Sequence, residues 1–139
     1  MSQSDKNRQM IRVLLVDDEK GYLNVLSNRL FKRSIHATKA FSGTEAIQIL
    51  RKNDFDVVVL DLKMEDMDGI EVLKVIKRMI PNLPVIILTG HGSQTAAREG
   101  VLFGAFDYLT KPCELSELMD IILEAHKYQQ NLSHDPHLD

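Results

Sequence analysis

Two stretches of the sequence, Ile11-Arg-Val-Leu-Leu-Val-Asp-Asp-Glu19 and Phe55-Asp-Val-Val-Val-Leu-Asp61, run from branched apolar residues directly into carboxylates. Short, nearly continuous apolar runs are typical of strands that are buried on both faces of a parallel sheet. Two later runs change to polar residues in the same way: Pro84–Leu88 leads into Thr89-Gly90, and Ala105–Leu109 leads into Thr110-Lys111-Pro112. We therefore expect these four segments to be strands.

Helical patterns separate these strands. Apolar residues recur at helical spacing around Leu23–Phe31, and Ser42-Gly-Thr-Glu45 is a capping box that opens the next helix. Alternating strands and helices predict an α/β fold: a single doubly wound, five-stranded parallel sheet with five helices on its two faces. The expected strands are 11–16, 35–41 (near an edge), 55–60, 84–88 and 105–109, and the remaining helices lie at 69–81, 94–103 and from Leu115 onward.

Length and composition limit the classes of protein. The chain has 139 residues and a net charge of -3, which fits one domain and argues against direct nucleic-acid binding. Its apolar runs are far shorter than the ~20 residues that span a bilayer, and the first residues lack the apolar core of a signal peptide. A single cysteine, Cys113, excludes an internal disulfide and multi-cysteine metal sites. We expect a cytoplasmic protein without membrane contact, with flexible segments at 1–9 and 131–139 around a domain at 10–130.

Carboxylate, hydroxyl and ammonium side chains follow the expected strands. The carboxyl ends of parallel strands meet at one edge, so Asp17, Asp18, Asp61, Thr89 and Lys111 are predicted to converge there. Clustered carboxylates without histidine or cysteine favour a hard cation such as Mg²⁺. A hydroxyl and an ammonium can bind phosphoryl oxygens, and one carboxylate can act as the nucleophile. Each residue alone has an ordinary structural interpretation, but the combination predicts phosphoryl transfer onto an aspartate.

Four motifs, together covering the same strand ends, resemble those of a known family. From about Ile11 to Lys127, the chain is similar to the receiver domain of two-component response regulators, most closely to nitrogen-regulator-type receivers. The resemblance implies the flavodoxin-like strand order 2-1-3-4-5 and a cis peptide bond at Lys111-Pro112. The motifs are Val16-Asp-Asp-Glu19, Val59-Leu-Asp-Leu-Lys-Met64 with Asp68-Gly69, Leu88-Thr-Gly90 and Gly104-Ala-Phe-Asp-Tyr-Leu-Thr-Lys-Pro112.

The resemblance also implies a role for each matching residue. Asp61 would be the phosphoacceptor, and Lys111 would pair first with Asp61 and then with the phosphoryl group. Mg²⁺ (or Mn²⁺) would be bound by Asp18 and Asp61, by Asp17 through water, and by the backbone carbonyl of Lys63.

Three further roles concern signalling and its duration. Thr89 would move to the phosphoryl group, and Tyr108 would turn inward with it. Lys63 and His91 would flank the path of the hydrolysing water. Because neither orients water well, we expect slow loss of phosphate.

These roles describe a phosphorylation-operated switch and not a turnover enzyme. The resemblance implies a sensor histidine kinase or a histidine phosphotransfer protein as donor. The signal would pass through the face formed by the fourth helix, the fifth strand and the fifth helix to an output protein or domain, with phosphorylation-dependent dimerisation as a further expectation. The sequence leaves open whether the receiver stands alone or belongs to a longer protein.

Three other functions fit the sequence less well. A flavodoxin-like flavin carrier needs a phosphate-binding loop where Asp17-Asp18-Glu19 stands. A haloacid-dehalogenase-like phosphatase needs its nucleophile at the end of the first strand with a second acid two residues later, and that spacing is absent. A phosphorylation-dead interaction module is disfavoured by the complete residue set.

Two local departures from the family pattern and one glycine within a predicted helix carry expectations of their own. Met64-Glu65 replaces the usual Met-Pro and predicts a looser, more acidic loop. Arg33-Ser34 stands where a helix-ending glycine is common. Gly100, inside a predicted helix, lowers helix stability by ~1 kcal/mol relative to alanine. Of two interpretations, a role in the movement that this helix makes in the family and a merely tolerated glycine, the second is favoured.

Overall fold

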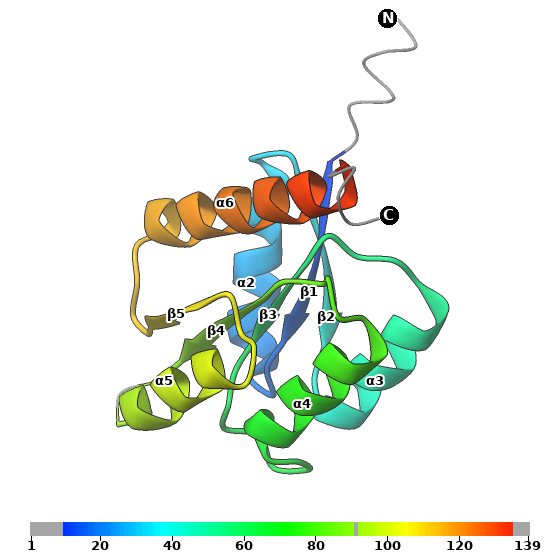
Figure 1. Cartoon of the computed structure of the whole chain (residues 1–139). Helices are drawn as coiled ribbons and strands as arrows, with labels where there is room; N and C mark the ends of the chain where they lie inside the picture. Colours follow the sequence, from blue (N-terminus) through cyan, green and yellow to red (C-terminus); the bar gives the residue numbers. More distant parts are fainter. Residues whose placement is uncertain (1–9, 91, 135–139) are drawn as a thin grey trace, which may run out of the picture.

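A computed structural model describes residues 10–90 and 92–134, and within these ranges five strands alternate with five helices (Figure 1). The strands are β1 (Ile11–Val16), β2 (Ile35–Ala40), β3 (Val57–Leu60), β4 (Val85–Thr89) and β5 (Asp107–Thr110). The helices are α2 (Lys20–Phe31), α3 (Gly43–Lys52), α4 (Gly69–Met79), α5 (Gln94–Leu102) and α6 (Leu115–His134).

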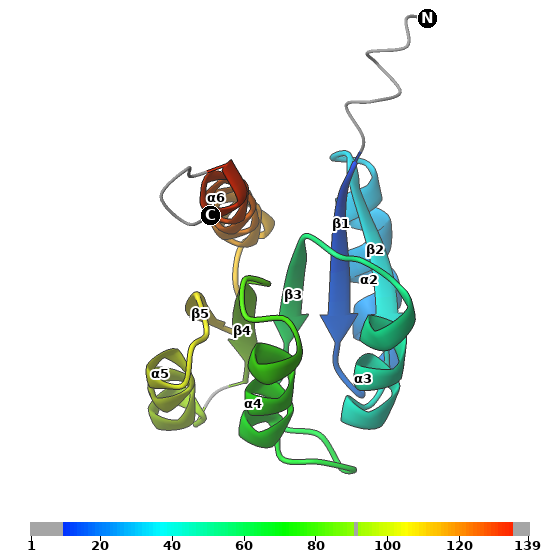
Figure 2. The same ribbon diagram turned by 45° about the vertical axis from the view of Figure 1, so that its right-hand side comes forward.

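The strands form one parallel sheet in the order β2-β1-β3-β4-β5, which confirms the expected fold. The last residues of β2, β1 and β3 lie in register, since Val16 of β1 faces both Ala40 and Leu60. Leu60 pairs with Ile87, so β4 ends two residues further on, at Thr89, which faces Thr110 of β5. Figure 2 shows the strands pointing to the same edge of the sheet. The residues that follow them are therefore brought together at that edge.

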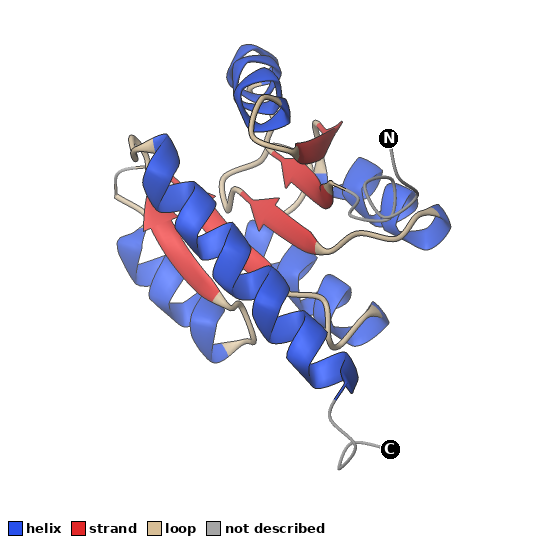
Figure 3. Ribbon diagram, turned by 90° about the horizontal axis from the view of Figure 1, so that it is seen from above, coloured by secondary structure: helices blue, strands red, loops and turns tan. Residues whose placement is uncertain are grey.

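Alternate residues of each strand enter two separate cores. Leu14, Val58 and Ile87 contribute to the core beneath α3, α4 and α5. Their neighbours Val13, Val57 and Ile86 contribute to the core beneath α2 and α6. This two-residue alternation is what a pleated sheet covered on both faces requires. Figure 3 shows the sheet between helices on its two sides.

Most element boundaries agree with expectation to within two residues. The expected N-cap is present, since Ser42 Oγ accepts from the Glu45 N–H at 3.0 Å. Glu45 reaches back as expected, but its Oε1 accepts from the N–H of Phe41, the residue before the N-cap, at 2.7 Å. The last helix is longer than expected: it continues through residues 131–134, which the sequence suggested were part of a flexible tail. The expected flexible segment 1–9 and the remaining tail residues 135–139 lie outside the described residues.

The interpretation of Gly100 as merely tolerated is wrong. Gly100 is buried where α5 crosses the sheet, and a Cβ at this position would collide with Cδ1 of the fully buried Ile87. It would also lie 3.5 Å from Ile70 Cδ1. The glycine allows α5 to approach β4 closely. Helix propensity alone does not predict this requirement, because it depends on tertiary packing.

Ser34, three residues beyond the end of α2 at Phe31, has the backbone conformation that usually selects glycine. Ser34 has a φ of 65°, in the left-handed region, and its N–H donates to the Phe31 carbonyl at 3.2 Å. Serine therefore occupies the helix-terminating position that glycine fills at lower steric cost.

Candidate functional site

Three buried polar residues mark the edge of the sheet where the strands end. Asp17 follows β1, Asp61 follows β3, and Thr89 ends β4; their exposed fractions are 2%, 6% and 1%. The backbone continues sheet bonding through both aspartates, because the Asp17 N–H donates to the Ala40 carbonyl at 3.1 Å and the Asp61 N–H donates to Val16 at 2.9 Å. The carboxylates are thus fixed by the sheet itself.

Asp61 accepts two hydrogen bonds on the same carboxylate oxygen. The Thr89 hydroxyl donates to Oδ1 at 2.7 Å, and the Lys63 N–H donates to it at 3.2 Å. Oδ2 faces the Lys111 ammonium at 3.4 Å. A short hydroxyl bond, a backbone amide and a cation therefore surround the Asp61 carboxylate.

Lys111 lies among three carboxylates. Its Nζ contacts Asp17 Oδ2 at 2.6 Å, Asp61 Oδ2 at 3.4 Å and Glu19 Oε1 at 3.5 Å. Its closest partner is Asp17, whereas the family resemblance pointed first to Asp61. The backbone of Lys111 is held by an N–H bond to the Thr89 carbonyl at 2.7 Å, and the following peptide bond to Pro112 is cis, as expected.

Two neighbours of Lys111 had no assigned role in the sequence analysis. The ammonium lies 4.5 Å from the ring centroid of Tyr22, a cation–π contact from α2. Glu19 supplies the third carboxylate, and its own N–H donates to Asp17 Oδ1 at 3.0 Å. The Asp-Asp-Glu motif indicated the glutamate, but no sequence signal predicted that Tyr22 lies against the lysine.

Burial and charge oppose each other at this edge. Burial raises the pKa of Asp17, and the Asp61 charge adds to this, while the Lys111 bond and the Glu19 amide only partly offset it. Burial works against the Lys111 ammonium, but its hydrogen bond to Asp17 and the charges of Asp17, Asp61 and Glu19 outweigh it and raise the pKa of Lys111. The lysine thus stays charged, and the buried carboxylates favour a further cation.

The acidic cluster has the donors that a hard metal ion needs. One carboxylate oxygen from each of Asp17, Asp18 and Asp61 lies within 4.8 Å of the others. An all-oxygen set with few direct carboxylates fits Mg²⁺ or Mn²⁺. The buried, raised-pKa carboxyl of Asp17 fits the same conclusion, since a divalent cation would favour its ionised form.

Hydrogen bonds anchor the loop between β3 and α4, for which Met64-Glu65 predicted a looser conformation than Met-Pro. Asp66, which belongs to none of the family motifs, accepts three hydrogen bonds from the start of α3. The Gly69 N–H donates to Leu62 at 3.1 Å, and Met64 packs against the core. Glu65 does make the loop acidic and exposed, as its sequence indicated.

The other sequence-predicted residues lie around this centre. The half-buried Tyr108 on β5 packs against a core, and its hydroxyl accepts from Arg98 Nε of α5 at 3.4 Å. The Lys63 side chain is exposed. His91 lies outside the described residues. The roles assigned to these residues remain predictions.

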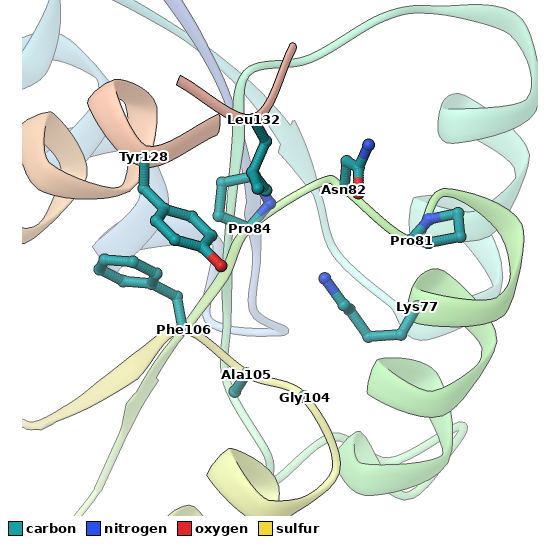
Figure 4. Close-up of a pocket in the computed structure, with 9 residues that line it drawn as sticks. All are labelled: Lys77, Pro81, Asn82, Pro84, Gly104, Ala105, Phe106, Tyr128 and Leu132. Carbon is teal, nitrogen blue, oxygen red and sulfur yellow. The ribbon is translucent and has the colours of Figure 1, made fainter. Parts of the chain in front are cut away.

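A separate pocket lies at the opposite edge of the sheet, around residues that precede β4 and β5. Its volume is about 530 Å³. Lys77 extends into it from α4, while Phe106 and Tyr128 form the facing wall (Figure 4). The two rings pack with centroids 5.7 Å apart. Lys77 Nζ donates to the Leu83 carbonyl at 2.9 Å, so its amine closes the turn between α4 and β4.

Comparison with known proteins assigns the chain to a family. The response regulator receiver domain family matches residues 13–123, and the chain belongs to that family. Its members are regulatory domains of two-component systems. This membership removes the flavin carrier and the dehalogenase-like phosphatase as interpretations. Among the described residues, none of the helices combines the length and apolar character needed to cross a membrane.

Individual relatives support the same assignment. The chain is 39% identical over 113 residues to the transcriptional regulatory protein GlrR of Escherichia coli (strain K12), covering 81% of this chain and 26% of GlrR. It is 35% identical over 118 residues to an NtrX-like response regulator of Rickettsia bellii, covering 84% and 25%. A crystal structure of a receiver domain protein from Clostridium thermocellum superposes with a TM-score of 0.85 at 34% identity, covering 88% of this chain and 99% of that one. The chain thus spans about a quarter of the length of these curated relatives.

Proposed function

We propose that this domain is a phosphorylation-operated switch in which Asp61 accepts a phosphoryl group. The observation that carries the proposal is the surroundings of one carboxylate: Asp61 contacts the Thr89 hydroxyl at 2.7 Å and the Lys111 ammonium at 3.4 Å. The buried acid Asp17 lies beside them. A nucleophilic oxygen, a hydrogen-bond donor and a fixed cation are the parts needed for phosphoryl transfer.

In the proposed reaction, a carboxylate oxygen of Asp61 attacks the phosphorus of a phosphohistidine. The phosphorus–nitrogen bond breaks, the imidazole leaves with the bonding electron pair, and an acyl phosphate remains on Asp61. Thr89 and Lys111 each bind a phosphoryl oxygen. Asp17, Asp18, Asp61 and the Lys63 carbonyl would hold Mg²⁺ (or Mn²⁺), which when bound neutralises charge on the phosphoryl oxygens.

The switch requires two arrangements of the same residues. In the proposed switch, the Thr89 hydroxyl moves from Asp61 Oδ1 to the phosphoryl group. This movement changes the volume available to the Tyr108 side chain on the neighbouring strand β5. Tyr108 also contacts Arg98 of α5, so its movement would alter the face formed by α5, β5 and α6. That face is the proposed contact with an output domain or with a second copy of the chain.

The proposed phosphodonor is a sensor histidine kinase or a histidine phosphotransfer protein in the cytoplasm.

A small apolar hollow lies beside the site, between α2 and the segment after Lys111. It is lined by Tyr22, Val25, Leu26, Arg29, Cys113 and Leu115. Val25 is 60% exposed. This surface could receive a donor helix so that its phosphohistidine reaches Asp61.

Intact mass spectrometry after incubation with acetyl phosphate and Mg²⁺ tests the central proposal. The wild type should gain the mass of one phosphoryl group and should lose it again during incubation with Mg²⁺ in the absence of a chelator. Asp61→Ala should gain none. Asp54→Ala, which removes an exposed acid at the opposite edge, is the matched control and should behave as the wild type. A wild type that stays unmodified, or an Asp61→Ala variant that is modified equally, would contradict the proposal.

A further inference from the structure

One side chain ties the β3–α4 loop to the start of α3. Asp66 Oδ1 accepts from the Gly43 N–H at 3.0 Å, and Oδ2 accepts from the Thr44 N–H at 3.0 Å and from the Thr44 hydroxyl at 2.9 Å. The Thr44 N–H is the main cause of a lowered pKa at Asp66; the Gly43 N–H and the Thr44 hydroxyl add to it. We call this set of contacts the Asp66 clamp.

The clamp completes the capping of α3 from outside the helix. The first amides of a helix have no acceptor within it. Here Ser42 accepts from Glu45 through its side chain and from Ala46 through its carbonyl, both at 3.0 Å. The two remaining amides, Gly43 and Thr44, are those that Asp66 binds. A carboxylate is also favoured at this end by the helix dipole.

Close packing also holds the β3–α4 loop and α4 against the start of α3. A Cβ on Gly43 would lie 2.6 Å from Val72 Cγ2 and 3.3 Å from Met67 Cβ. Only a residue without a side chain allows the loop and α4 to approach α3 so closely. Two independent features, the Asp66 carboxylate and the Gly43 backbone, therefore hold the loop against the helix.

The clamp joins the two sides of the acidic site. On one side, the loop begins at Asp61 and carries Lys63, whose N–H donates to Asp61 Oδ1 at 3.2 Å. On the other side, α3 follows β2, and the Ala40 carbonyl of β2 accepts from the Asp17 N–H at 3.1 Å. Asp66 therefore fixes the distance between the loop and the strand pair that carries Asp17.

We propose that Asp66 is a positioning residue for cation binding at the site. By holding the loop against α3, it keeps the Lys63 carbonyl in place relative to the Asp17 and Asp61 carboxylates. This inference rests on the proposed function. The Asp66 side chain is bonded to Gly43 and Thr44, and the carboxylates that gather at the site are those of Asp17, Asp18 and Asp61.

The experiment measures Mg²⁺ affinity by isothermal titration calorimetry, at a temperature where every variant is folded. Asp66→Ala should weaken Mg²⁺ binding about tenfold, the lower end of the effect of removing residues that support metal ligands. Thr44→Val, which removes only one of the three bonds, should weaken it less. In Asp66→Ala, the amide resonances of Gly43 and Thr44 should shift while those of β1 stay unchanged, which shows a folded protein with an open clamp.

Two controls separate the clamp from other effects. Glu65→Gln removes a neighbouring exposed charge and should leave affinity within about twofold, because long-range charge effects at the surface are screened. Thr44→Val should have no further effect in the Asp66→Ala background, since both act through one contact set. Equal binding by Asp66→Ala and the wild type, an equal loss in Glu65→Gln, or additive losses in the double variant would each overturn the inference. A wild type that binds no Mg²⁺ would instead overturn the proposed function.

Discussion

The Thr89 hydroxyl donates its 2.7 Å hydrogen bond to the same Asp61 oxygen that receives the Lys63 amide, while Lys111 faces the other oxygen. A phosphoryl group on Asp61 cannot leave this arrangement unchanged, because one carboxylate oxygen becomes the bridging atom. Thr89 is the donor that is free to follow, since its side chain requires only a rotation about one bond.

We predict that Thr89→Val separates phosphorylation from the conformational change. Valine has nearly the same shape but no hydroxyl, so Asp61 can still be modified while the link to β5 is lost. With beryllofluoride as phosphoryl analogue, wild-type amide shifts should extend from Thr89 to Leu118, and in Thr89→Val they should be confined to the Asp61 loop. Thr89→Ser should restore the wide pattern. A Thr89→Val variant with full shifts on α5 and α6 would contradict this role.

The lifetime of the acyl phosphate should depend on Lys63. Its exposed side chain follows Asp61 closely and can cover phosphoryl oxygens without orienting water. Lys63→Asn introduces a carboxamide, which can position an attacking water, and should speed phosphate release severalfold. His91→Glu is the companion variant, at the second position for which the family resemblance implies an effect on lifetime. If neither substitution changes the release rate at fixed Mg²⁺, the lifetime is set elsewhere.

Gly100→Ala should destabilise the domain although alanine favours helix. The propensity gain is about 1 kcal/mol, but overpacking against Ile87 costs about 1–3 kcal/mol. Urea denaturation should therefore give a lower unfolding free energy. Gly21→Ala in α2 is the control, because its Cβ would meet nothing within 4 Å, and it should be neutral or stabilising. An equal gain in both variants would show that packing at Gly100 is not limiting.

Lys77 should make stability depend on pH in the alkaline range. Burial lowers the pKa of Lys77 below 10.5 in the folded protein, so between the two pKa values the unfolded chain holds more protons. The unfolding free energy of the wild type should then rise with pH in that window by an amount that Lys77→Met lacks. Urea denaturation at pH 8 and pH 10 measures the difference. Identical changes in the two proteins would mean that the pKa of Lys77 does not differ between states.

Val25→Glu should impair phosphorylation by a protein donor and not by a small molecule. Val25 lines the hollow next to the site, whereas Phe31, also exposed, lies near the far end of α2. With a histidine-phosphorylated protein that phosphorylates the wild type, transfer should fall about tenfold, as loss of one central apolar contact allows. Rates with acetyl phosphate should stay unchanged. Phe31→Glu should match the wild type with both donors; equal impairment by the two variants would place the docking surface elsewhere.

The sheet and the main site were predictable because periodicity and strand-end residues carry them. The apolar runs determined the strands, and the parallel topology then placed Asp17, Asp61 and Lys111 at one edge. Contacts between residues distant in sequence were not predictable in the same way. The Asp66 clamp, the Tyr22 contact with Lys111 and the steric need for Gly100 all depend on side chains that meet only after α2, α3 and α5 pack against the sheet.

Because α6 is long, a small tilt at its first turn produces a large displacement at its last turn. Its 20 residues begin at Leu115, a few positions after Lys111, and end at His134. At 1.5 Å per residue the helix is about 30 Å long, so a tilt of about 5° at its first turn would displace its last turn by about 2.6 Å. A tilt that begins next to the acidic cluster would thus be largest at the opposite edge of the sheet, where Tyr128 and Leu132 line the separate pocket.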